Sequence, residues 1–277
     1  MPGFLLDRGR YTTFDPPETG VRLLPAGINN RGQITGEYLG PGNESGFLRD
    51  RRGKVTKVDL PGATATEVVK INDRGVIAGA YSRTVPFLSD PNGMAHGFLL
   101  DRGKVTRIDV PGAVQTEAAG INDRRQVVGV FTDAGDTSHG FLWNKGRFTT
   151  IDVPGAAYSE PIDINDHGQI VGIYGEGSGT GPIHGFLWDK GRFTTIDVPG
   201  VPITIPFGIN DHGQIVGSTL TDAATLSGAR GFLLRNGVDG PVTPISFPGA
   251  PRTLATGIND RGQIVGAYEN PNAAPSP

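Results

Sequence analysis

One phrase recurs six times along this chain, and its period constrains the fold more than any other feature. Its fullest copy reads His-Gly-Phe-Leu-Trp at 184–188, Thr-Thr-Ile-Asp-Val-Pro-Gly at 194–200 and Gly-Ile-Asn-Asp-His-Gly-Gln-Ile-Val-Gly at 208–217. The copies are marked by Gly-Phe pairs that start at Gly3, Gly46, Gly97, Gly140, Gly185 and Gly231, so successive spacings are 43, 51, 43, 45 and 46 residues. A fixed period near 45 residues indicates a repeat architecture in which each copy is one supersecondary unit.

Each copy reads as four short strands, with no helical periodicity. In the fullest copy we expect strands at 186–188, 192–198, 203–210 and 214–218, because these runs are rich in Phe, Ile, Val and Thr. Two tight turns separate them, Asp-Lys-Gly at 189–191 and Asp-His-Gly at 211–213. Each turn ends in glycine, which predicts three-residue hairpins with the glycine in the left-handed conformation.

Four antiparallel strands per copy predict an all-β protein, a six-bladed β-propeller with one blade per copy. We name the strands A (ending in Ile-Asn), B (Gln-Ile-Val-Gly), C (Gly-Phe-Leu) and D (Thr-Thr-Ile-Asp). The chain opens with strands C and D at 3–15 and ends with strands A and B at 257–268. We therefore expect the N-terminal strands to pair with the C-terminal strands and close the ring. Residues 1–270 form the single propeller domain in this interpretation, and 271–277 form a flexible C-terminal tail. A β-solenoid is the alternative, but its coils are usually shorter than this period.

Composition excludes several classes of function. The net charge is −3 without a run of Lys or Arg, which argues against nucleic-acid and anionic-membrane partners. The chain contains no cysteine, so disulfides, thiol catalysis and cysteine-based metal sites are excluded. The chain begins directly in the first copy, so we expect either a cytoplasmic protein or a secreted one whose signal peptide has been removed. We expect a monomer whose partner is a small molecule or a carbohydrate.

The repeated phrase also carries a family resemblance. His-Gly-Phe at 96–98, 139–141 and 184–186, together with Ile-Asp-Val-Pro-Gly and Gly-Ile-Asn-Asp-x-Gly-Gln-Ile-Val-Gly, resembles the HAF-repeat family of bacterial, often extracellular proteins. That family takes its name from a His-Ala-Phe element, and this chain lacks the histidine in its other three copies. The resemblance implies a repeat fold and favours an extracellular or periplasmic location. It implies no agreed activity and no catalytic residues.

Departures from the repeat indicate where function lies, because each copy is a control for the other five. In a propeller the A strands line the central channel, and the D–A and B–C connections share one face, which we call the top face. The A–B and C–D hairpins share the other, the bottom face. The B–C connections vary most, the longest being Tyr81–His96. Variable loops on a constant scaffold usually carry function.

The first departure concerns the residue four before the Ile of Ile-Asn, near the top of strand A. In chain order it is Leu24, Glu67, Glu117, Glu160, Ile205 and Leu254. The three copies with a glutamate also carry a histidine at the start of strand C: His96, His139 and His184. One half of the channel mouth is therefore expected to be acidic and to bear histidines, and the other half to be apolar, with Phe207 beside the aliphatic residues.

Two kinds of chemistry suit this cluster. Clustered carboxylates can bind a hard cation such as Ca²⁺, so Glu67, Glu117 and Glu160 are candidate metal ligands. Like charges can also raise one carboxyl pKa for acid–base work, so the same glutamates, with His139, are candidate catalytic residues. The structural alternative is that each glutamate caps a Pro-Gly turn or pairs with a neighbour.

The second departure concerns the residue just before that Ile: Gly27, Lys70, Gly120, Asp163, Gly208 and Gly257. Two charged residues replace glycine on strands that face the channel, and burying either one unpaired would be costly. Lys70 and Asp163 are expected to meet each other or solvent across the channel. The alternative interpretation gives them a catalytic role.

The third departure is an aromatic set at the end of strand B: Tyr38, Tyr81, Phe131, Tyr174 and Tyr268, with Thr219 as the exception. These rings can pack between blades, or Tyr81, Phe131 and Tyr174 can rim a ligand pocket. The recurring Asn-Asp pairs of the A–B turns, by contrast, are ordinary turn chemistry. The aspartates of Thr-Thr-Ile-Asp are expected to support the adjacent Pro-Gly turn.

Two functions remain open at this point. One is a binding module with a single asymmetric site for a small molecule or glycan at the top-face mouth, with His96, His184 and the apolar residues Leu24, Ile205, Phe207 and Leu254 as ligand-binding residues. The other is an enzyme that uses the glutamate cluster, either as a metal-dependent hydrolase or lactonase or as a metal-free lyase or isomerase. No Gly-x-Ser-x-Gly elbow, His-Glu-x-x-His motif, P-loop or dinucleotide fingerprint is present.

Overall fold

The computed structural model describes residues 1–15, 21–40, 43–83, 95–177 and 181–270, and every helix or strand assigned within them is a β-strand. The expected tail at 271–277 and most of the longest B–C connection lie outside the described residues. The strands are β1 Gly3–Asp7, β2 Arg10–Phe14, β3 Arg22–Ile28, β4 Ile34–Gly40, β5 Asn43–Arg49, β6 Val55–Val58, β7 Ala65–Ile71, β8 Ile77–Ser82, β9 His96–Asp101, β10 Lys104–Ile108, β11 Gln115–Ile121, β12 Val127–Thr132, β13 Ser138–Asn144, β14 Arg147–Thr150, β15 Tyr158–Ile164, β16 Ile170–Gly175, β17 Ile183–Asp189, β18 Arg192–Ile196, β19 Ile203–Ile209, β20 Ile215–Leu220, β21 Arg230–Leu234, β22 Val242–Ile245, β23 Thr253–Ile258 and β24 Ile264–Tyr268.

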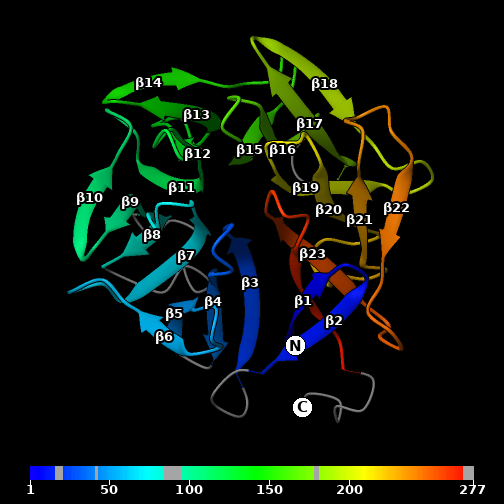
Figure 1. The fold of residues 1–277 in the computed structure, drawn as a ribbon. Coiled ribbons are helices and arrows are strands. Elements are labelled where there is room, and N and C mark those ends of the chain that lie inside the picture. The colour runs from blue at the N-terminus through cyan, green and yellow to red at the C-terminus, as the bar shows by residue number, and fades with distance from the viewer. Residues whose placement is uncertain (16–20, 41–42, 84–94, 178–180, 271–277) are drawn as a thin grey trace.

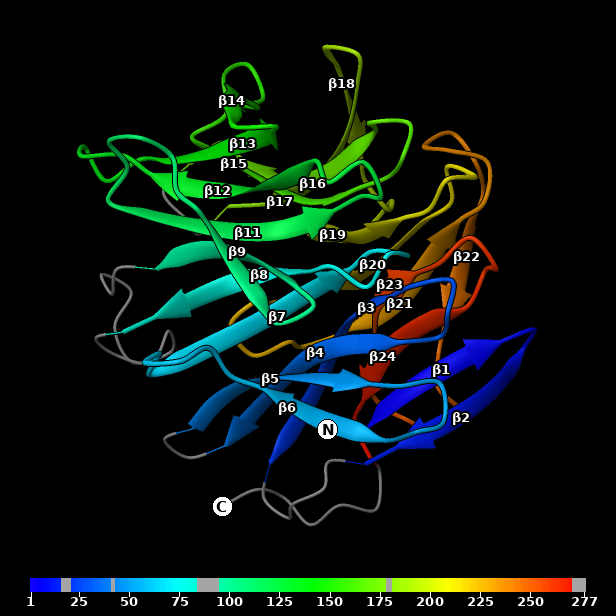
Figure 2. The same ribbon diagram turned by 60° about the vertical axis from the view of Figure 1, so that its left-hand side comes forward.

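These strands form antiparallel sheets that stand around a central axis, with β3, β7, β11, β15, β19 and β23 innermost (Figure 1). Four sheets have four strands each, in the orders β2-β1-β24-β23, β3-β4-β5-β6, β10-β9-β8-β7 and β11-β12-β13-β14. The fifth sheet holds two further antiparallel groups, β15 to β18 and β19 to β22, joined by a parallel pair between Ile183 and Ile203. Figure 2 shows the groups β3–β6, β7–β10 and β11–β14 one above another.

The two ends of the chain meet in one sheet. Strand β1 pairs antiparallel with β24, and the register runs from Gly3 opposite Ala267 to Leu6 opposite Ile264. The first two strands of the chain thus complete the sheet begun by the last two.

The strands of the fullest copy lie within a few residues of their predicted bounds. Of its two turns, one has the predicted length and the other does not. The A–B turn has the predicted three-residue form, because the N–H of Asn210 donates to the backbone oxygen of Gln214 across it, and Gly213 is in the left-handed region at φ 69°. The C–D turn was predicted wrongly: Asp189 pairs with Arg192, so the loop has only two residues, Lys190 and Gly191. Their φ values are 50° and 88°, the mark of a type I′ turn, whose twist matches that of the flanking strands.

The Gly-Phe pairs explain how the sheets pack. Their phenylalanines, Phe4, Phe47, Phe98, Phe141, Phe186 and Phe232, are at most 2 % exposed. The preceding glycine makes room for the A strand of the next copy. A Cβ on Gly140 would lie 2.6 Å from the ring of Pro161, and one on Gly185 would lie 2.8 Å from that of Pro206. The repeat therefore sets both the core and the approach of neighbouring sheets.

A cycle of side-chain hydrogen bonds links the A–B turns. Each buried Asn of Ile-Asn donates from its Nδ2 to the backbone oxygen of the equivalent Asn in the next copy, at 3.0 to 3.1 Å, in the order Asn29, Asn72, Asn122, Asn165, Asn210, Asn259 and back to Asn29. The same side chains accept backbone N–H groups of their own turns, as Asn122 Oδ1 does from Arg124 and Gln126. The asparagines of the Asn-Asp pairs thus have a structural role, because their hydrogen bonds connect the A–B turns of all six copies.

Candidate functional site

The three glutamates of the first departure lie near the start of the innermost strands β7, β11 and β15. Each is the third residue of its strand. The residue before each glutamate is a buried Thr or Ser whose hydroxyl oxygen accepts a backbone N–H from the D–A connection, as Ser159 does from Val153 at 2.9 Å. This bond fixes where strand A begins, and therefore where the carboxylate stands at the top end of the channel.

The glutamates are close enough to affect one another's ionisation. Burial raises the pKa of Glu117 to about 7, and the charges of Glu67 and Glu160 on either side add to the rise. Burial also raises the pKa of Glu160. The expected grouping of three carboxylates is therefore present, and its middle member titrates near neutrality.

This cluster does not have the arrangement of a metal site. Among the described residues, no three histidine, aspartate or glutamate side chains are placed so that they could hold a metal ion. The residue types would suit Ca²⁺, but their placement does not fit it, and we derive no chemistry through a metal.

A pocket of about 500 Å³ opens beside Glu160 on the top face. Tyr158, Ile173 and Ile183 line it together with Glu160, and residues 136–138 of the preceding B–C connection form its other wall. Burial and the neighbouring Glu160 charge raise the pKa of Tyr158, so its hydroxyl stays protonated at neutral pH. The pocket thus offers a carboxyl, a phenol and an aliphatic wall to one ligand.

Tyr158 lines this pocket but was not among the site residues predicted from the sequence. Its position, six before the Ile of Ile-Asn, holds Arg22, Ala65, Gln115, Ile203 or Arg252 in the other copies. It is the single aromatic residue at that position, so the comparison between copies contained the signal that would have found it.

The opposite half of the channel mouth is apolar, as expected. Leu254 is 7 % exposed and packs in a cluster with Ile203 and Leu220, and Ile205 lies against this cluster. Leu24 and Phe207 are partly buried in the same ring of innermost strands. A ligand at the mouth would meet carboxylates on one side and hydrocarbon on the other.

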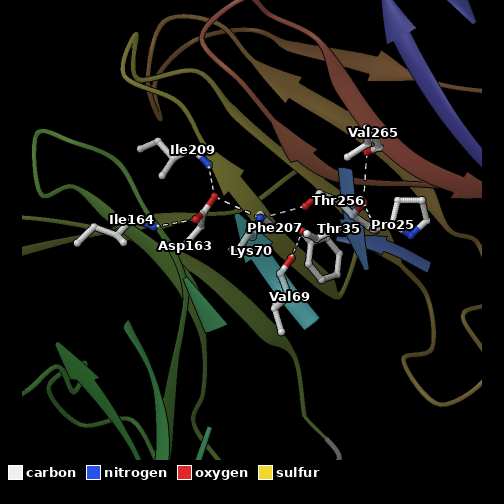
Figure 3. Close-up of polar contacts among 10 residues, drawn as sticks. All are labelled: Pro25, Thr35, Val69, Lys70, Asp163, Ile164, Phe207, Ile209, Thr256 and Val265. Atoms are coloured by element: carbon white, nitrogen blue, oxygen red, sulfur yellow. Dashed lines mark hydrogen bonds and ion pairs between the residues drawn. The ribbon is translucent and has the colours of Figure 1, made fainter. Parts of the chain in front are cut away.

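Lys70 of β7 and Asp163 of β15 form a buried ion pair between the innermost strands (Figure 3). The Lys70 Nζ lies 3.3 Å from Asp163 Oδ2 and donates to the backbone oxygens of Phe207 at 2.7 Å and Thr256 at 3.3 Å. Asp163 also accepts the N–H groups of Ile164 and Ile209. Burial raises the pKa of Asp163, while Lys70 and these two donors oppose the rise.

The ion pair thus ties four innermost strands, β7, β15, β19 and β23, across the axis. It matches the expectation that the two residues meet across the channel. Because both charges are satisfied by protein groups, this geometry favours the structural interpretation over a catalytic one.

The three histidines form a different arrangement from the one expected. Each imidazole contacts, through Nδ1, the aspartate that follows strand D of its own copy. His96 contacts Asp109 at 3.3 Å, His139 contacts Asp152 at 2.7 Å and His184 contacts Asp197 at 2.9 Å. Each also lies on the aromatic ring of strand B, from Tyr81, Phe131 or Tyr174, at centroid distances of 5.2 to 5.4 Å. These three aspartates therefore hold a histidine, where the sequence suggested support for a Pro-Gly turn.

The strand register explains why the histidines and the glutamates stay apart. Tyr81 stands opposite both Thr66 and His96, whereas Glu67 stands opposite Ala80, one residue along. Residues directly opposite share a face of the sheet and successive residues alternate, so Glu67 and His96 lie on opposite faces. The same register holds for Glu117 with His139 and for Glu160 with His184.

A second, smaller hollow of about 90 Å³ lies at the bottom end of the channel, below Lys70 and Asp163. The second residues of the Asn-Asp pairs surround it: Asp73, Asp123, Asp166, Asp211 and Asp260, with Asn30 in the first copy. Each carboxylate accepts the backbone N–H of the equivalent residue in the preceding copy, as Asp166 does from Asp123 at 2.8 Å. Burial and neighbouring aspartates raise the pKa values of Asp123 and Asp211.

Comparison with known proteins places the fold. No protein-family model and no curated protein sequence matches this chain. Among solved structures, a putative TolB from Agrobacterium tumefaciens is similar with a TM-score of 0.69 and 13 % identity, over 97 % of this chain and 98 % of that one. The β-propeller domain of the Trilobed protease from Pyrococcus furiosus is similar with a TM-score of 0.51 and 10 % identity, over 90 % and 91 %. Virginiamycin B lyase from Staphylococcus aureus is similar with a TM-score of 0.50 and 14 % identity, over 95 % and 85 %.

The chain therefore has a β-propeller fold. At 10 to 14 % identity these likenesses concern the fold alone, and the site has to be argued from its own residues. Among the described residues, the structure contains no helix long and apolar enough to cross a membrane.

Proposed function

We propose that this protein is a six-bladed propeller, closed by its first and last strands, that binds one small molecule at the top-face mouth of its channel. The ligand is amphipathic, with hydroxyl or amine groups on one side and hydrocarbon on the other, as in a sugar or an amino sugar. The observation that carries the proposal is the one-sided mouth, in which Glu117 with its pKa near 7 stands between two other glutamates and faces an aliphatic half.

Two further features support a single site. The pocket beside Glu160 has a volume typical of small-molecule sites, and it adds the Tyr158 ring to the carboxylates. Lys70 and Asp163 form a buried ion pair across the channel axis, and we expect this pair to form the floor of the site. A site repeated in every blade would need equivalent residues in all copies, whereas the glutamates occur in three adjacent ones.

An enzymatic role is the second candidate, and the pKa of Glu117 is the observation that favours it. A carboxyl group that titrates near neutrality is suited to general acid–base catalysis. The placement of the carboxylates does not fit a metal. Among enzymatic functions, we therefore favour a metal-free lyase or isomerase over a metal-dependent hydrolase or lactonase.

A ligand screen tests the proposal. Neutral sugars, amino sugars and small amines would be screened by ligand-detected NMR at pH 6 and pH 8, with Glu117→Gln, Glu160→Gln and Tyr158→Ala as site variants. Asp239→Asn is the matched control, because Asp239 is an exposed carboxylate on the C–D connection of another blade.

We expect a ligand whose affinity falls about tenfold or more in the site variants, as for loss of a hydrogen bond to a charged group, and stays unchanged in the control. Ligands that bind all variants equally would place their site elsewhere and contradict the proposal. Turnover of a bound ligand that is lost in Glu117→Gln would establish the enzymatic candidate.

A further inference from the structure

The bottom face also carries a pocket of about 710 Å³, distinct from the hollow at the end of the channel, and arginines are its most frequent lining residues. It lies between the sheet of β3–β6 and the sheet that contains both chain ends. Five arginines line it, Arg31, Arg49, Arg51, Arg52 and Arg261, and Asp50 is its one acidic lining residue. The chain as a whole has a net charge of −3, so this concentration of positive charge is local.

The pocket coincides with a break in the repeat. Arg49 replaces the Leu or Trp that the other copies carry at this place in strand C, such as Leu100 and Trp143. The C–D turn that follows is also one residue longer than that of the next copy, because Arg51 and Arg52 stand where the next copy has only Arg102.

The longer turn presents its arginines in a new conformation. In the next copy the turn residues Arg102 and Gly103 both have positive φ, as in a two-residue type I′ turn. In the longer turn only Gly53 does, and Asp50 Oδ1 accepts the backbone N–H groups of Arg52 and Lys54 at 2.9 Å each. Asp50 is therefore used to hold the turn.

The positive charges of the pocket are balanced only in part by the protein, because Asp50 is the one carboxylate that lines it beside five arginines. In the next copy, Asp101 binds both Arg102 and Arg125. Within the described part of the chain, by contrast, none of the five pocket arginines makes an ion pair. The Arg49 guanidinium lies 4.9 Å from the centroid of the Phe14 ring, and burial lowers its pKa.

We propose that this pocket is a binding site for a small phosphate-bearing polyanion with at least two negative charges. Guanidinium groups bind phosphate oxygens through paired N–H donors, and the planar fork favours multiply charged oxyanions. Several unpaired arginines around one hollow exceed what a single monoanion neutralises. The volume lies within the range of small-molecule sites, and the location is at the opposite end of the channel axis from the glutamates.

Calorimetric titration with inorganic pyrophosphate tests this site on the intact protein. The variants are Arg51→Ala, an exposed residue whose substitution is expected to leave the fold intact, and Arg49→Leu, which restores the residue type of the next copy. Arg102→Ala is the matched control, a turn arginine that already has Asp101 as partner. Glu117→Gln separates this site from the one proposed at the channel mouth.

We expect binding at low salt that weakens about tenfold or more in Arg51→Ala and in Arg49→Leu, and that is unchanged in Arg102→Ala and Glu117→Gln. Thermal melting of each variant shows whether it is folded. Absence of pyrophosphate binding at millimolar concentration, or equal weakening in Arg102→Ala, would overturn the proposal. Binding of a single-stranded oligonucleotide in the absence of pyrophosphate binding would overturn it in favour of a nucleic-acid partner.

Discussion

Glu117 is a buried carboxyl group whose charge state affects the stability of the fold. Its pKa is about 7 in the folded protein, against about 4.3 in an unfolded chain. A raised folded pKa contributes stability below the unfolded value, and this stability is lost as the pH rises through the folded value. We therefore expect Glu117→Gln to be more stable than the natural protein at pH 8, by up to about 3 kcal/mol, with the difference vanishing near pH 4. Urea unfolding at both pH values measures it, and equal stability at pH 8 would contradict the buried, like-charged environment.

Arg125 offers a second single-residue test. It occupies the position of the A–B turn at which the other copies have glycine, and its φ is 61°. A left-handed conformation costs a residue with a Cβ about 1–2 kcal/mol, whereas the exposed ion pair between Arg125 and Asp101 contributes little. Arg125→Gly is therefore expected to raise the free energy of unfolding by about 1 kcal/mol. Arg124→Gly, one residue earlier and without a positive φ, is the control and is expected to gain nothing.

The sequence identified individual site residues only where the copies could be compared position by position. Glu67, Glu117 and Glu160 could be predicted as a group because they share one position of strand A. The histidines were expected beside them because only one strand separates the two positions, which leaves out the face of the sheet on which each side chain lies. The pleat of the sheet turns His96 away from Glu67, and one residue of register decides this.

Turns show the same limit. The glycines predicted where hairpins occur, but four of the C–D turns have two residues rather than three, as where Asp189 pairs directly with Arg192. In the copy that starts at Gly46, a single inserted residue changes the turn type, and Asp50 Oδ1 then accepts two backbone N–H groups of the turn. Sequence alone did not distinguish these forms, because the cross-strand pair that defines the loop length is a structural quantity.

The histidine-bearing strand ends also predict a pH response. His139 lies between Asp152 and Asp133, 2.7 Å and 3.5 Å away, and packs on the Phe131 ring. The hydrogen bond to Asp152 does most to raise the pKa of His139. Stability from this histidine is therefore present at low pH and lost as the pH rises through the folded value.

His139→Asn should consequently reduce the melting temperature more at pH 5 than at pH 8. Scanning calorimetry at the two pH values measures this, with Asp152→Asn as the companion variant that removes the main partner. A decrement that is equal at both pH values would mean that His139 contributes through packing on Phe131 rather than through its charge.

In the whole molecule, the period of the sequence was enough to predict an all-β propeller, since about 45 residues and four strands per copy leave few alternatives. What holds neighbouring copies together could not be predicted. The Asn-Asp pair reads locally as turn chemistry, and the partner of each asparagine is an equivalent residue one copy away. Only the assembled geometry shows that local turns join into a cycle that returns from Asn259 to Asn29.

The cycle of asparagine hydrogen bonds leads to a prediction about the stability of the whole ring. Asn122 and Asn259 have matched surroundings: each is buried, donates to the backbone oxygen of the next copy and to a Gln side chain, and accepts two N–H groups. Removing either side chain leaves buried groups unsatisfied, at a cost of about 1–3 kcal/mol for each one. In a closed ring no copy is terminal, so Asn122→Ala and Asn259→Ala should lower the free energy of unfolding equally, in one cooperative transition.

Chemical denaturation of both variants measures the comparison, with the exposed turn residue Asn236→Ala as a control expected to stay within about 0.5 kcal/mol of the natural protein. In an open array of repeats the end copies fray, and each repeat adds its own term to the stability. A markedly smaller loss in Asn259→Ala than in Asn122→Ala, or a second transition at low denaturant, would therefore show that the bond from Asn259 to Asn29 does not close the ring in solution.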